Sequence, residues 1–178
     1  MTDLYLCRHG RTPLNAAGVL RGRQDPDLDE VGRAQAQALA ERLAGVHPAR
    51  VVSSPLRRAV RTATPLADAA GRPVQTDPRL IDRSYGRFDG TAAEPLIARY
   101  GSLDAAPGVE PAAEFAERVL AAANDWASGP GPVVLVTHDA AIRILLATLL
   151  PDAGVTQLDT GGSVLLTRDA DGWLLAGA

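Results

Sequence analysis

The segment Val133-Val134-Leu135-Val136-Thr137-His138-Asp139 has the pattern of a buried β-strand that ends in polar side chains. Its first five residues are aliphatic or β-branched and show no alternation of polar and apolar positions, which is typical of a parallel strand covered on both faces. Glycine and proline alternate just before it, at 129–132, and a helical pattern follows from Ala140 to Leu150. This strand and helix predict a protein of the α/β class.

The same succession of strand and helix occurs in the rest of the chain. We expect strands at Asp3–Cys7, Arg50–Ser53 and Pro73–Thr76, and helices at Glu30–Ala44, Pro55–Ala70, Ala93–Tyr100 and Pro111–Ala127, with Asp29 and Ser54 as N-caps of the first two. Near the end, Ser163–Thr167 and Trp173–Leu175 flank turn residues 169–172, which predicts an antiparallel hairpin. The predicted fold is a three-layer α/β/α sandwich with a mainly parallel sheet, an antiparallel edge strand and a single domain over residues 1–178.

Charge and composition exclude several classes of protein. The chain has 178 residues, 18 arginines, no lysine and 21 acidic residues, so its net charge is −3. It contains no block of five or six like charges, so we expect no nucleic-acid partner. It also has no basic signal sequence, no apolar stretch near the ~18 residues of a membrane span, and a single cysteine, Cys7, which cannot form an internal disulfide. We therefore expect a cytoplasmic protein without a membrane partner, and nothing in the sequence indicates its oligomeric state.

Basic and imidazole side chains follow three of the predicted strands. Arg8 and His9 follow the first, Arg58 comes after the second, and His138 follows the strand at 133–137. The carboxyl ends of parallel strands meet at one edge of a sheet, where helix N-termini attract anions. Arginine matches phosphate oxygens with its planar fork, and histidine can attack phosphorus or exchange protons near neutral pH, so the sequence predicts a phosphoryl site. The alternative is a set of arginines paired with carboxylates at the rim of the sheet. We expect no metal site, because the arginines would repel a cation.

Five blocks of sequence contain these side chains. They are Leu6-Cys7-Arg8-His9-Gly10-Arg11-Thr12 with Asn15; Arg21-Gly22 with Asp25-Pro26-Asp27-Leu28; Ser53-Ser54-Pro55-Leu56-Arg57-Arg58-Ala59; Asp82-Arg83-Ser84-Tyr85-Gly86-Arg87-Phe88-Asp89-Gly90; and Val136-Thr137-His138 with Ile142-Arg143. In this order the blocks resemble the histidine phosphatase superfamily, which includes the cofactor-dependent phosphoglycerate mutases. The likeness extends from residue 4 to about residue 150.

The resemblance implies a covalent mechanism that needs neither a metal nor another cofactor. His9 would attack the phosphate ester and form a phosphohistidine, while Arg8, Arg58 and His138 hold the phosphate oxygens. Water would then hydrolyse the phosphoenzyme. The resemblance also implies contacts with the substrate, a small phosphorylated metabolite, at Asn15, Arg21, Gly22, Arg83 and Tyr85.

A leaving alkoxide needs a proton, and two carboxyl groups are candidates for its donor. The resemblance points first to Asp82, although the family usually has glutamate at this position, one methylene longer. Asp139 is the rival, because this branch usually has glycine there, while a His-Asp pair supplies the acid in the related acid phosphatase and phytase branch. Asp139 is otherwise interpreted as the N-cap of the following helix or as a substrate contact.

The expected activity is hydrolysis of a small phosphomonoester. A mutase needs extra cations, which the family's mutases take from a long insertion, but between Thr91 and Thr137 this chain offers only Arg99 and Arg118. Mutase activity and a non-catalytic phosphate-binding protein on the same fold are the alternatives. We expect specificity to lie in the loops Gly18–Asp29 and Ser84–Pro111, and sugar phosphates, phosphoglycerates and nucleotide-pathway monophosphates all fit the sequence.

Overall fold

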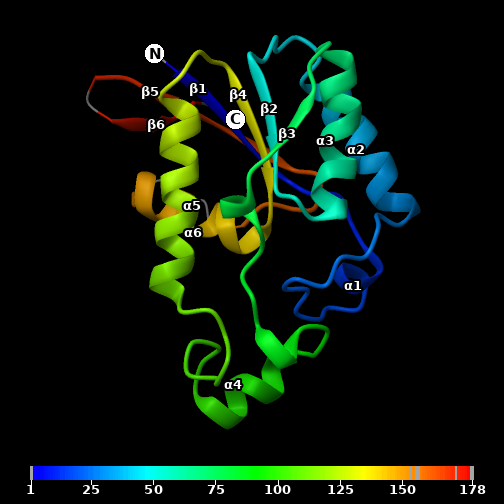
Figure 1. Ribbon diagram of the computed structural model, residues 1–178, viewed down its shortest axis with the longest axis vertical. Helices are drawn as coiled ribbons and strands as arrows, with labels where there is room; N and C mark the ends of the chain where they lie inside the picture. Colours follow the sequence, from blue (N-terminus) through cyan, green and yellow to red (C-terminus); the bar gives the residue numbers. More distant parts are fainter. Residues whose placement is uncertain (1, 153, 155–156, 171, 177–178) are drawn as a thin grey trace.

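One mixed β-sheet organises the computed structural model, which describes residues 2–152, 154, 157–170 and 172–176. The strands of this described chain lie in the order β3 (Val74–Thr76), β2 (Arg50–Ser53), β4 (Val133–Thr137), β1 (Thr2–Arg8), β5 (Ser163–Arg168) and β6 (Trp173–Leu175). The first four are parallel, β5 runs antiparallel to β1, and β6 runs antiparallel to β5 (Figure 1). The mainly parallel sheet and the antiparallel hairpin are therefore confirmed, while Asp171 of the predicted turn lies outside the described residues.

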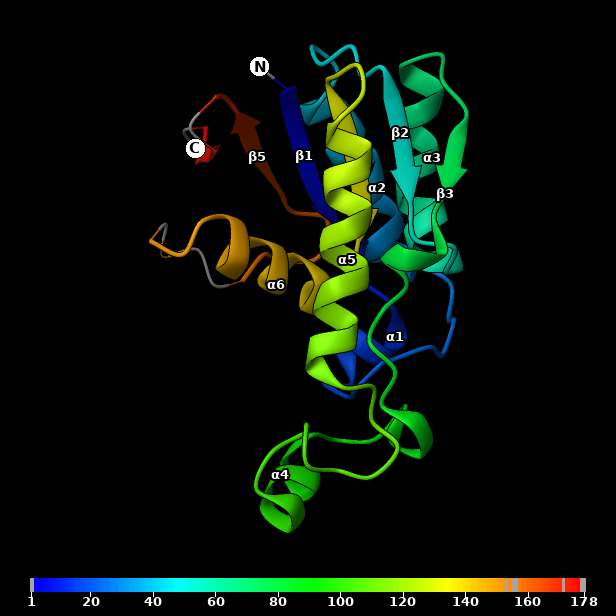
Figure 2. The same cartoon turned by 60° about the vertical axis from the view of Figure 1, so that its left-hand side comes forward.

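Helices cover both faces of the sheet (Figure 2). Helices α2 (Glu30–Arg42) and α3 (Arg57–Ala69) pack on one face, and α5 (Ala112–Ala127) and α6 (Asp139–Leu149) pack on the other. Asp29 caps α2 as predicted, because its side chain accepts a hydrogen bond from the backbone N–H of Gly32. These layers confirm the α/β/α sandwich. Within the described residues, no helix is long and apolar enough to span a bilayer.

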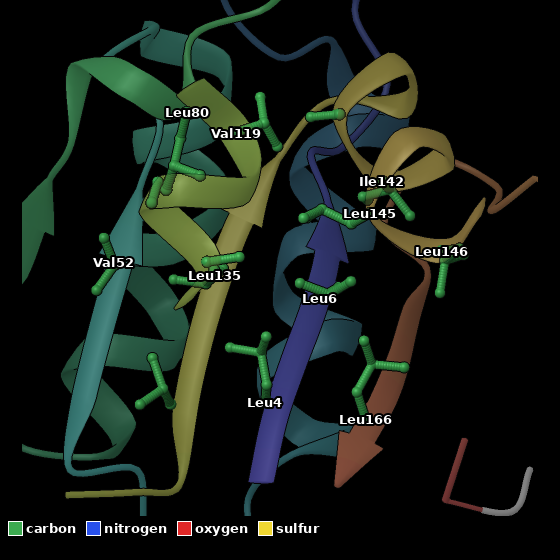
Figure 3. Close-up of a cluster of buried hydrophobic side chains, with 14 of the residues drawn as sticks. Leu4, Leu6, Val52, Leu80, Val119, Leu135, Ile142, Leu145, Leu146 and Leu166 are labelled. Atoms are coloured by element: carbon green, nitrogen blue, oxygen red, sulfur yellow. The ribbon is translucent and has the colours of Figure 1, made fainter. Parts of the chain in front are cut away.

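The apolar core has one part on each face of the sheet. Leu6 and Leu135 join the cluster that includes side chains of α5 and α6 (Figure 3). Cys7 and Val134 join the cluster on the α2 and α3 side, because successive side chains of a strand point to opposite faces. Every residue of β4 is buried, as its continuous apolar sequence predicts. Burial of each leucine side chain stabilises the folded state by about 1.5–3 kcal/mol. The sheet is therefore a stable support for the loops at its carboxyl edge.

Several segments extend beyond the carboxyl ends of the parallel strands, at the lower end of the molecule in Figure 1. Helix α1 (Pro13–Ala16) follows β1, and a long excursion after β3 contains the 3₁₀ turns η1 (Pro78–Leu80) and η2 (Gly86–Phe88) and the helix α4 (Glu94–Tyr100). A small apolar cluster centred on Tyr85 gives the excursion a core of its own and includes Leu20 from the loop after α1. The short helix predicted in this region is confirmed.

One predicted helix start is wrong. Helix α3 begins at Arg57 and not at Pro55 after a Ser54 cap. The Ser54 hydroxyl does accept the N–H of Leu56, but it also lies 2.8 Å from the imidazole Nε2 of His138. Ser54, the predicted cap, therefore contacts the candidate site, and the helix begins two residues later than predicted.

The cap predicted for α6 is also wrong. His138 occupies the N-cap position without a side-chain capping bond, and Asp139 is the first helical residue. The Asp139 carboxylate forms ion pairs with Arg8 and Arg143 instead.

Candidate active site

Three strand ends bring the predicted catalytic side chains together. Arg8 ends β1 and His9 follows it, Arg58 lies in the first turn of α3 after β2, and His138 follows β4. The N–H of His9 donates to the carbonyl of Thr137 (3.0 Å), so β1 and β4 stay paired up to the two histidines. The centroids of the two imidazole rings are 5.2 Å apart, and both side chains are fully buried.

Close backbone contacts fix the turn that carries His9. A Cβ on Gly10 would lie 2.4 Å from the carbonyl oxygen of Gly32, so only glycine fits where this turn meets α2. The N–H of Gly10 donates to the hydroxyl of Thr62 on α3 (2.9 Å). The turn is thus held against two helices, which fixes the orientation of the His9 ring.

The hydrogen bonds of His9 show which ring nitrogen is free to react. Nδ1 lies 2.7 Å from the carbonyl oxygen of Gly10, and a carbonyl accepts only from a protonated nitrogen. Nε2 then carries a lone pair and accepts from the Nε of Arg58 at 3.3 Å. Burial and the charge of Arg58 hold the pKa of this imidazole well below its usual range, so the ring is neutral at neutral pH. The arrangement provides a neutral and oriented nucleophile.

His138 presents an unused nitrogen to the same site. Nε2 lies 2.8 Å from the Ser54 hydroxyl, whereas Nδ1 is buried and has no hydrogen-bond partner among the described residues. Burial and the charge of Arg58 hold the pKa of His138 well below its usual range. When the Ser54 hydroxyl donates to Nε2, the proton of the neutral ring resides on Nδ1, which can then donate to an oxygen of a bound anion.

Arg58 is fully buried and binds four groups with its guanidinium. It donates to Nε2 of His9, to the carboxylate of Asp82 (3.0 Å), and to the carbonyls of Gly22 (2.9 Å) and Gln24. These contacts join α3 to the loop after α1 and to the excursion after β3. Arg58 therefore places a positive charge against the nucleophile and holds both loops around it.

Arg8 and Arg21 add two further guanidinium groups. The Nε of each is buried and has no hydrogen-bond partner in the described part of the chain. After burial and Arg58, these two charges lower the pKa of His9 further. Arg8 and Arg58 are buried and Arg21 is half-buried, and three arginines with little access to water favour an anionic ligand. Their two Nε–H groups and Nδ1 of His138 are donors without acceptors in the described protein.

Asp82 is a buried carboxyl group beside a histidine and an arginine. Its Oδ1 accepts the N–H of Arg83 (2.9 Å), and its Oδ2 pairs with Arg58 and lies 3.8 Å from Nδ1 of His138. Burial raises the pKa of this carboxyl, although Arg58 and then Arg21 oppose the rise. A carboxyl group that holds its proton more tightly than usual is suited to protonate a leaving oxygen.

Asp139, the rival carboxyl, is bound to two arginines. Its Oδ1 accepts from Nη1 of Arg8 (3.1 Å), and its Oδ2 lies 3.3 Å from the Nε of Arg143, one turn further along α6. Arg8 also donates to the carbonyl of Leu158. Asp139 and this carbonyl anchor the Arg8 guanidinium from one side.

Two of the predicted substrate contacts, Asn15 and Gly22, make contacts within the protein itself. Oδ1 of Asn15 accepts from the N–H and the hydroxyl of Thr12, and the Thr12 hydroxyl accepts the N–H of Asn15, which completes the capping box of α1. Gly22 has a φ of +50°, and a Cβ there would collide with the Asp89 carboxylate. Its carbonyl also accepts from Arg58, so Gly22 helps to hold the site whether or not it touches a ligand.

Arg83 and Tyr85, two further predicted contacts, line a cavity of about 310 Å³, and Arg83 is the residue that follows Asp82 in the chain. Arg143 adds another polar group to the lining, while Phe115 and Ile144 contribute apolar surface. Burial and the Asp82 charge raise the pKa of Tyr85 to about 12, so its hydroxyl stays protonated and can donate a hydrogen bond. A second cavity, of about 410 Å³, lies between α2 and α3 and is lined by none of the side chains of this site.

The sequence analysis assigned no role to Arg143 and considered Arg118 only as a cation that a mutase could use to bind a second anion. The spacing of four residues between Asp139 and Arg143 is the helical ion-pair spacing, so the partner of Arg143 could have been found from the sequence. Arg118 carried no comparable signal, because its partners lie in other segments. The described residues contain no group of three or more His, Cys, Asp or Glu side chains placed to hold a metal ion.

Nearly the whole chain is similar to proteins of known sequence and structure. Glucosyl-3-phosphoglycerate phosphatases of Mycolicibacterium vanbaalenii and Mycobacterium tuberculosis are 39% and 32% identical to it, over 83% and 96% of this chain and 73% and 86% of theirs. A probable phosphoglycerate mutase of Erwinia tasmaniensis is 33% identical, over 84% of this chain and 75% of its own. A solved structure of a mycobacterial glucosyl-3-phosphoglycerate phosphatase with VO3 has a TM-score of 0.83 at 30% identity, and the match covers 99% of this chain and 98% of that one. The profile of the histidine phosphatase superfamily (branch 1) matches residues 4–177, and the chain belongs to that family.

Proposed function

We propose that this protein is a phosphatase that hydrolyses a small phosphomonoester through a phosphohistidine formed on Nε2 of His9. The observation that carries the proposal is an unprotonated Nε2 among buried donors without acceptors in the described protein, namely Nε of Arg8, Nε of Arg21 and Nδ1 of His138. A phosphoryl group supplies the oxygens that such donors need, and it presents an electrophilic phosphorus to the nucleophile.

In the first step, the lone pair of His9 Nε2 attacks phosphorus while the bond from phosphorus to the ester oxygen breaks. Arg8, Arg58 and His138 hold the phosphate oxygens, and the Nε–H of Arg58 moves from His9 to one of them. Asp82, as the neutral acid, gives its proton to the departing oxygen, which leaves as an alcohol. The raised pKa of Asp82 supports this role.

In the second step, the Asp82 carboxylate takes a proton from a water molecule whose oxygen attacks phosphorus. The bond from phosphorus to Nε2 breaks, its electron pair returns to the imidazole, and inorganic phosphate leaves. Asp82 is then protonated again. The cycle consumes one water molecule and requires no metal ion, because the arginine side chains already offset the charge of the phosphate.

For the leaving group, we propose a hydroxy acid or its glycoside. The cavity of about 310 Å³ combines Arg83, Arg143 and Tyr85, which suit a carboxylate, with apolar surface that suits the face of a sugar ring. The two relatives named glucosyl-3-phosphoglycerate phosphatase support this choice. Glucosyl-3-phosphoglycerate and 3-phosphoglycerate are therefore the first compounds to assay.

Phosphoglycerate mutase activity is the second candidate, because of the 33% identical relative that is a probable mutase. A mutase must hold a second anion and keep water from the phosphohistidine. Arg118 donates all its N–H groups to acceptors of the protein itself, so only the exposed Arg99 of α4 remains between 91 and 137 for a second anion. Hydrolysis is the better supported reaction.

Trapping of the phosphoenzyme tests the proposal. Rapid quenching with a ³²P-labelled ester should label the wild type with an acid-labile, base-stable bond, and His9→Ala should abolish both labelling and phosphate release. His47→Ala, which changes an exposed histidine, is the matched control and should keep both. Phosphate release should also persist in EDTA.

Three results would contradict parts of this assignment. Interconversion of 3-phosphoglycerate faster than release of phosphate would establish the mutase. Tight vanadate binding without phosphate release from any aryl ester would establish a binding protein. Loss of activity in EDTA, restored by a divalent cation, would overturn metal independence.

A further inference from the structure

Asp82 lies in a segment without regular secondary structure. It follows η1, and residues 81–85 belong to no helix or strand. Its backbone therefore lacks the repeating hydrogen bonds that fix a residue within such an element. A group that transfers a proton must nevertheless be held to within roughly 0.5 Å of its productive position, so other contacts must hold this segment.

Arg118 of α5 supplies hydrogen bonds to that backbone. Its Nη1 donates to the carbonyls of Arg79 and Ile81 (2.7 Å each), and its Nη2 donates to the carbonyl of Asp82 (3.2 Å). Nε and Nη2 also donate to the two carboxylate oxygens of Glu110 (2.7 and 2.9 Å). A guanidinium has five N–H groups, and these bonds engage all of them.

Glu110 holds the chain on the other side of Asp82. Its Oε2 accepts the N–H of Ser84 (3.0 Å), its own N–H donates to the Ser84 carbonyl (2.9 Å), and its carbonyl accepts from the Arg83 guanidinium. Burial opposes ionisation of Glu110, but the hydrogen bonds from Arg118 and Ser84 outweigh it and hold the pKa of its carboxyl below the usual value. The pair of Arg118 and Glu110 is therefore charged at neutral pH and contacts the chain both before and after Asp82.

The surroundings of the pair limit its motion. The side chains of Arg118 and Glu110 are only 19% and 12% exposed, and the guanidinium carbon lies 4.7 Å from the centroid of the buried Phe115 ring. Among the described hydrogen bonds and ion pairs, neither side chain contacts His9 or His138. The hydrogen bonds of the pair reach the candidate site through the backbone around Asp82, while Glu110 also pairs with Arg23 (3.6 Å) and the charge of Arg118 is one of several that lower the pKa of His138.

We infer that Arg118 and Glu110 form a positioning pair that sets the Asp82 carboxyl for proton transfer to the leaving group, an inference that rests on the phosphatase function proposed above. A leaving group that departs as a stable anion needs little help from Asp82, whereas an alkoxide needs its proton. The contribution of the pair must therefore depend on the leaving group. A purely structural role would affect every ester alike.

The test compares p-nitrophenyl phosphate with a simple alkyl phosphate as substrates of the whole protein. In Arg118→Met, the rate of phosphoenzyme formation in a rapid-quench single turnover should fall about 100-fold for the alkyl ester, the effect of a misplacement on the order of 1 Å, and less than about three-fold for the aryl ester. This rate is compared because water attacks the same phosphoenzyme whichever ester formed it, so a slower second step would lower kcat for both. Binding of vanadate should change little, because the phosphate ligands are untouched. Arg118→Lys, which keeps the charge but not the planar fork, and Glu110→Gln should show the same selectivity with smaller losses.

Arg50→Met is the matched control. Arg50 also donates to two backbone carbonyls and lies over an aromatic ring, that of Trp126, but it stands at the amino end of β2. Its loss should lower stability without changing the ratio of alkyl to aryl rates. Circular dichroism and urea unfolding of each variant give its folded fraction, and each rate is divided by that fraction. If the Arg118 variants do not fold, Glu110→Gln is compared with the wild type instead.

The double variant Asp82→Asn/Arg118→Met shows whether Arg118 acts through Asp82. Once the Asp82 carboxyl is removed, the Arg118 substitution should not lower the rate for the alkyl ester any further. Two results would overturn the positioning role and leave the phosphatase function intact. In one, the activity losses of the two single substitutions multiply in the double variant. In the other, Arg118→Met alone lowers the rates for both esters equally. A wild-type protein that releases no phosphate from either ester would overturn both.

Discussion

Acidification should destabilise this protein through His9 and His138. Both side chains are fully buried, and burial and Arg58 hold both pKa values well below the usual 6.5. In the unfolded chain the same imidazoles titrate near 6.5. Below that pH the unfolded state therefore binds more protons than the folded state, so the free energy of unfolding falls as the pH falls.

The size of the effect follows from the number of groups. One imidazole that stays neutral in the folded state changes the free energy of unfolding by about 1.36 kcal/mol per pH unit, so two change it by about 2.7. Asp82 acts in the opposite direction, because its folded pKa is raised above 3.8 and the folded state takes up its proton first as the pH falls. At any pH where the unfolded imidazoles are protonated and the folded state takes up the Asp82 proton, the slope decreases to about 1.4 kcal/mol per pH unit. Asp29, Asp77 and Glu110 have lowered pKa values, so their stabilising contributions are lost only below about pH 4.5.

Urea unfolding at a series of pH values between about 7.5 and about 5 measures this slope. His9→Gln and His138→Gln should each reduce it by about 1.4 kcal/mol per pH unit. A free energy of unfolding that stays constant or rises on acidification would mean that the imidazoles accept protons in the folded state. The neutral nucleophile, and the mechanism built on it, would then be wrong.

Three further predictions concern the proposed acid and the residues that hold the site in place. Asp139→Asn should lower the rate of phosphoenzyme formation from an alkyl phosphate less than about ten-fold, whereas Asp82→Asn should lower that rate about 10²–10⁴-fold and spare the rate for p-nitrophenyl phosphate; the reverse order would make Asp139 the acid. Gly32→Ala places a Cβ 2.0 Å from a carbonyl oxygen and should cost about 1–3 kcal/mol in urea unfolding, while Gly45→Ala, with open space around it, is the neutral control. Thr62→Val leaves the buried N–H beside the nucleophile without an acceptor and should cost about 1–3 kcal/mol, which an unchanged unfolding midpoint would contradict.

Much of the fold was readable from local patterns. The continuous apolar run of β4 predicted a strand buried on both faces, and the structure has the same bounds for it. Asp29 marked the start of α2, because a carboxylate beside the first turn accepts a free N–H. The pattern failed at Ser54, where the same capping signal belongs to a hydroxyl that also contacts His138, a residue 84 positions away.

The candidate site was predictable as a place but not as a set of roles. Strand ends and the family resemblance brought Arg8, His9, Arg58 and His138 to one edge of the sheet, and the structure places all four there. The resemblance alone left two carboxyls in competition. Their difference appears in the contacts, since Asp139 is bound to Arg8 while Asp82 is buried against Arg58.

Local sequence was therefore sufficient for the strands, most of the helices and the edge where the chemistry lies, because apolar periodicity and caps act between near neighbours in the chain. The proposed protonation state of His9, the preference for Asp82 over Asp139 as the proposed acid and the positioning role inferred for Arg118 needed the folded chain. Each depends on burial and on charges brought close by folding, as with Arg58 and Asp82, which are 24 positions apart, or Arg8 and Asp139, which are 131 apart. Desolvation and ion pairing act across space, and sequence spacing does not encode them.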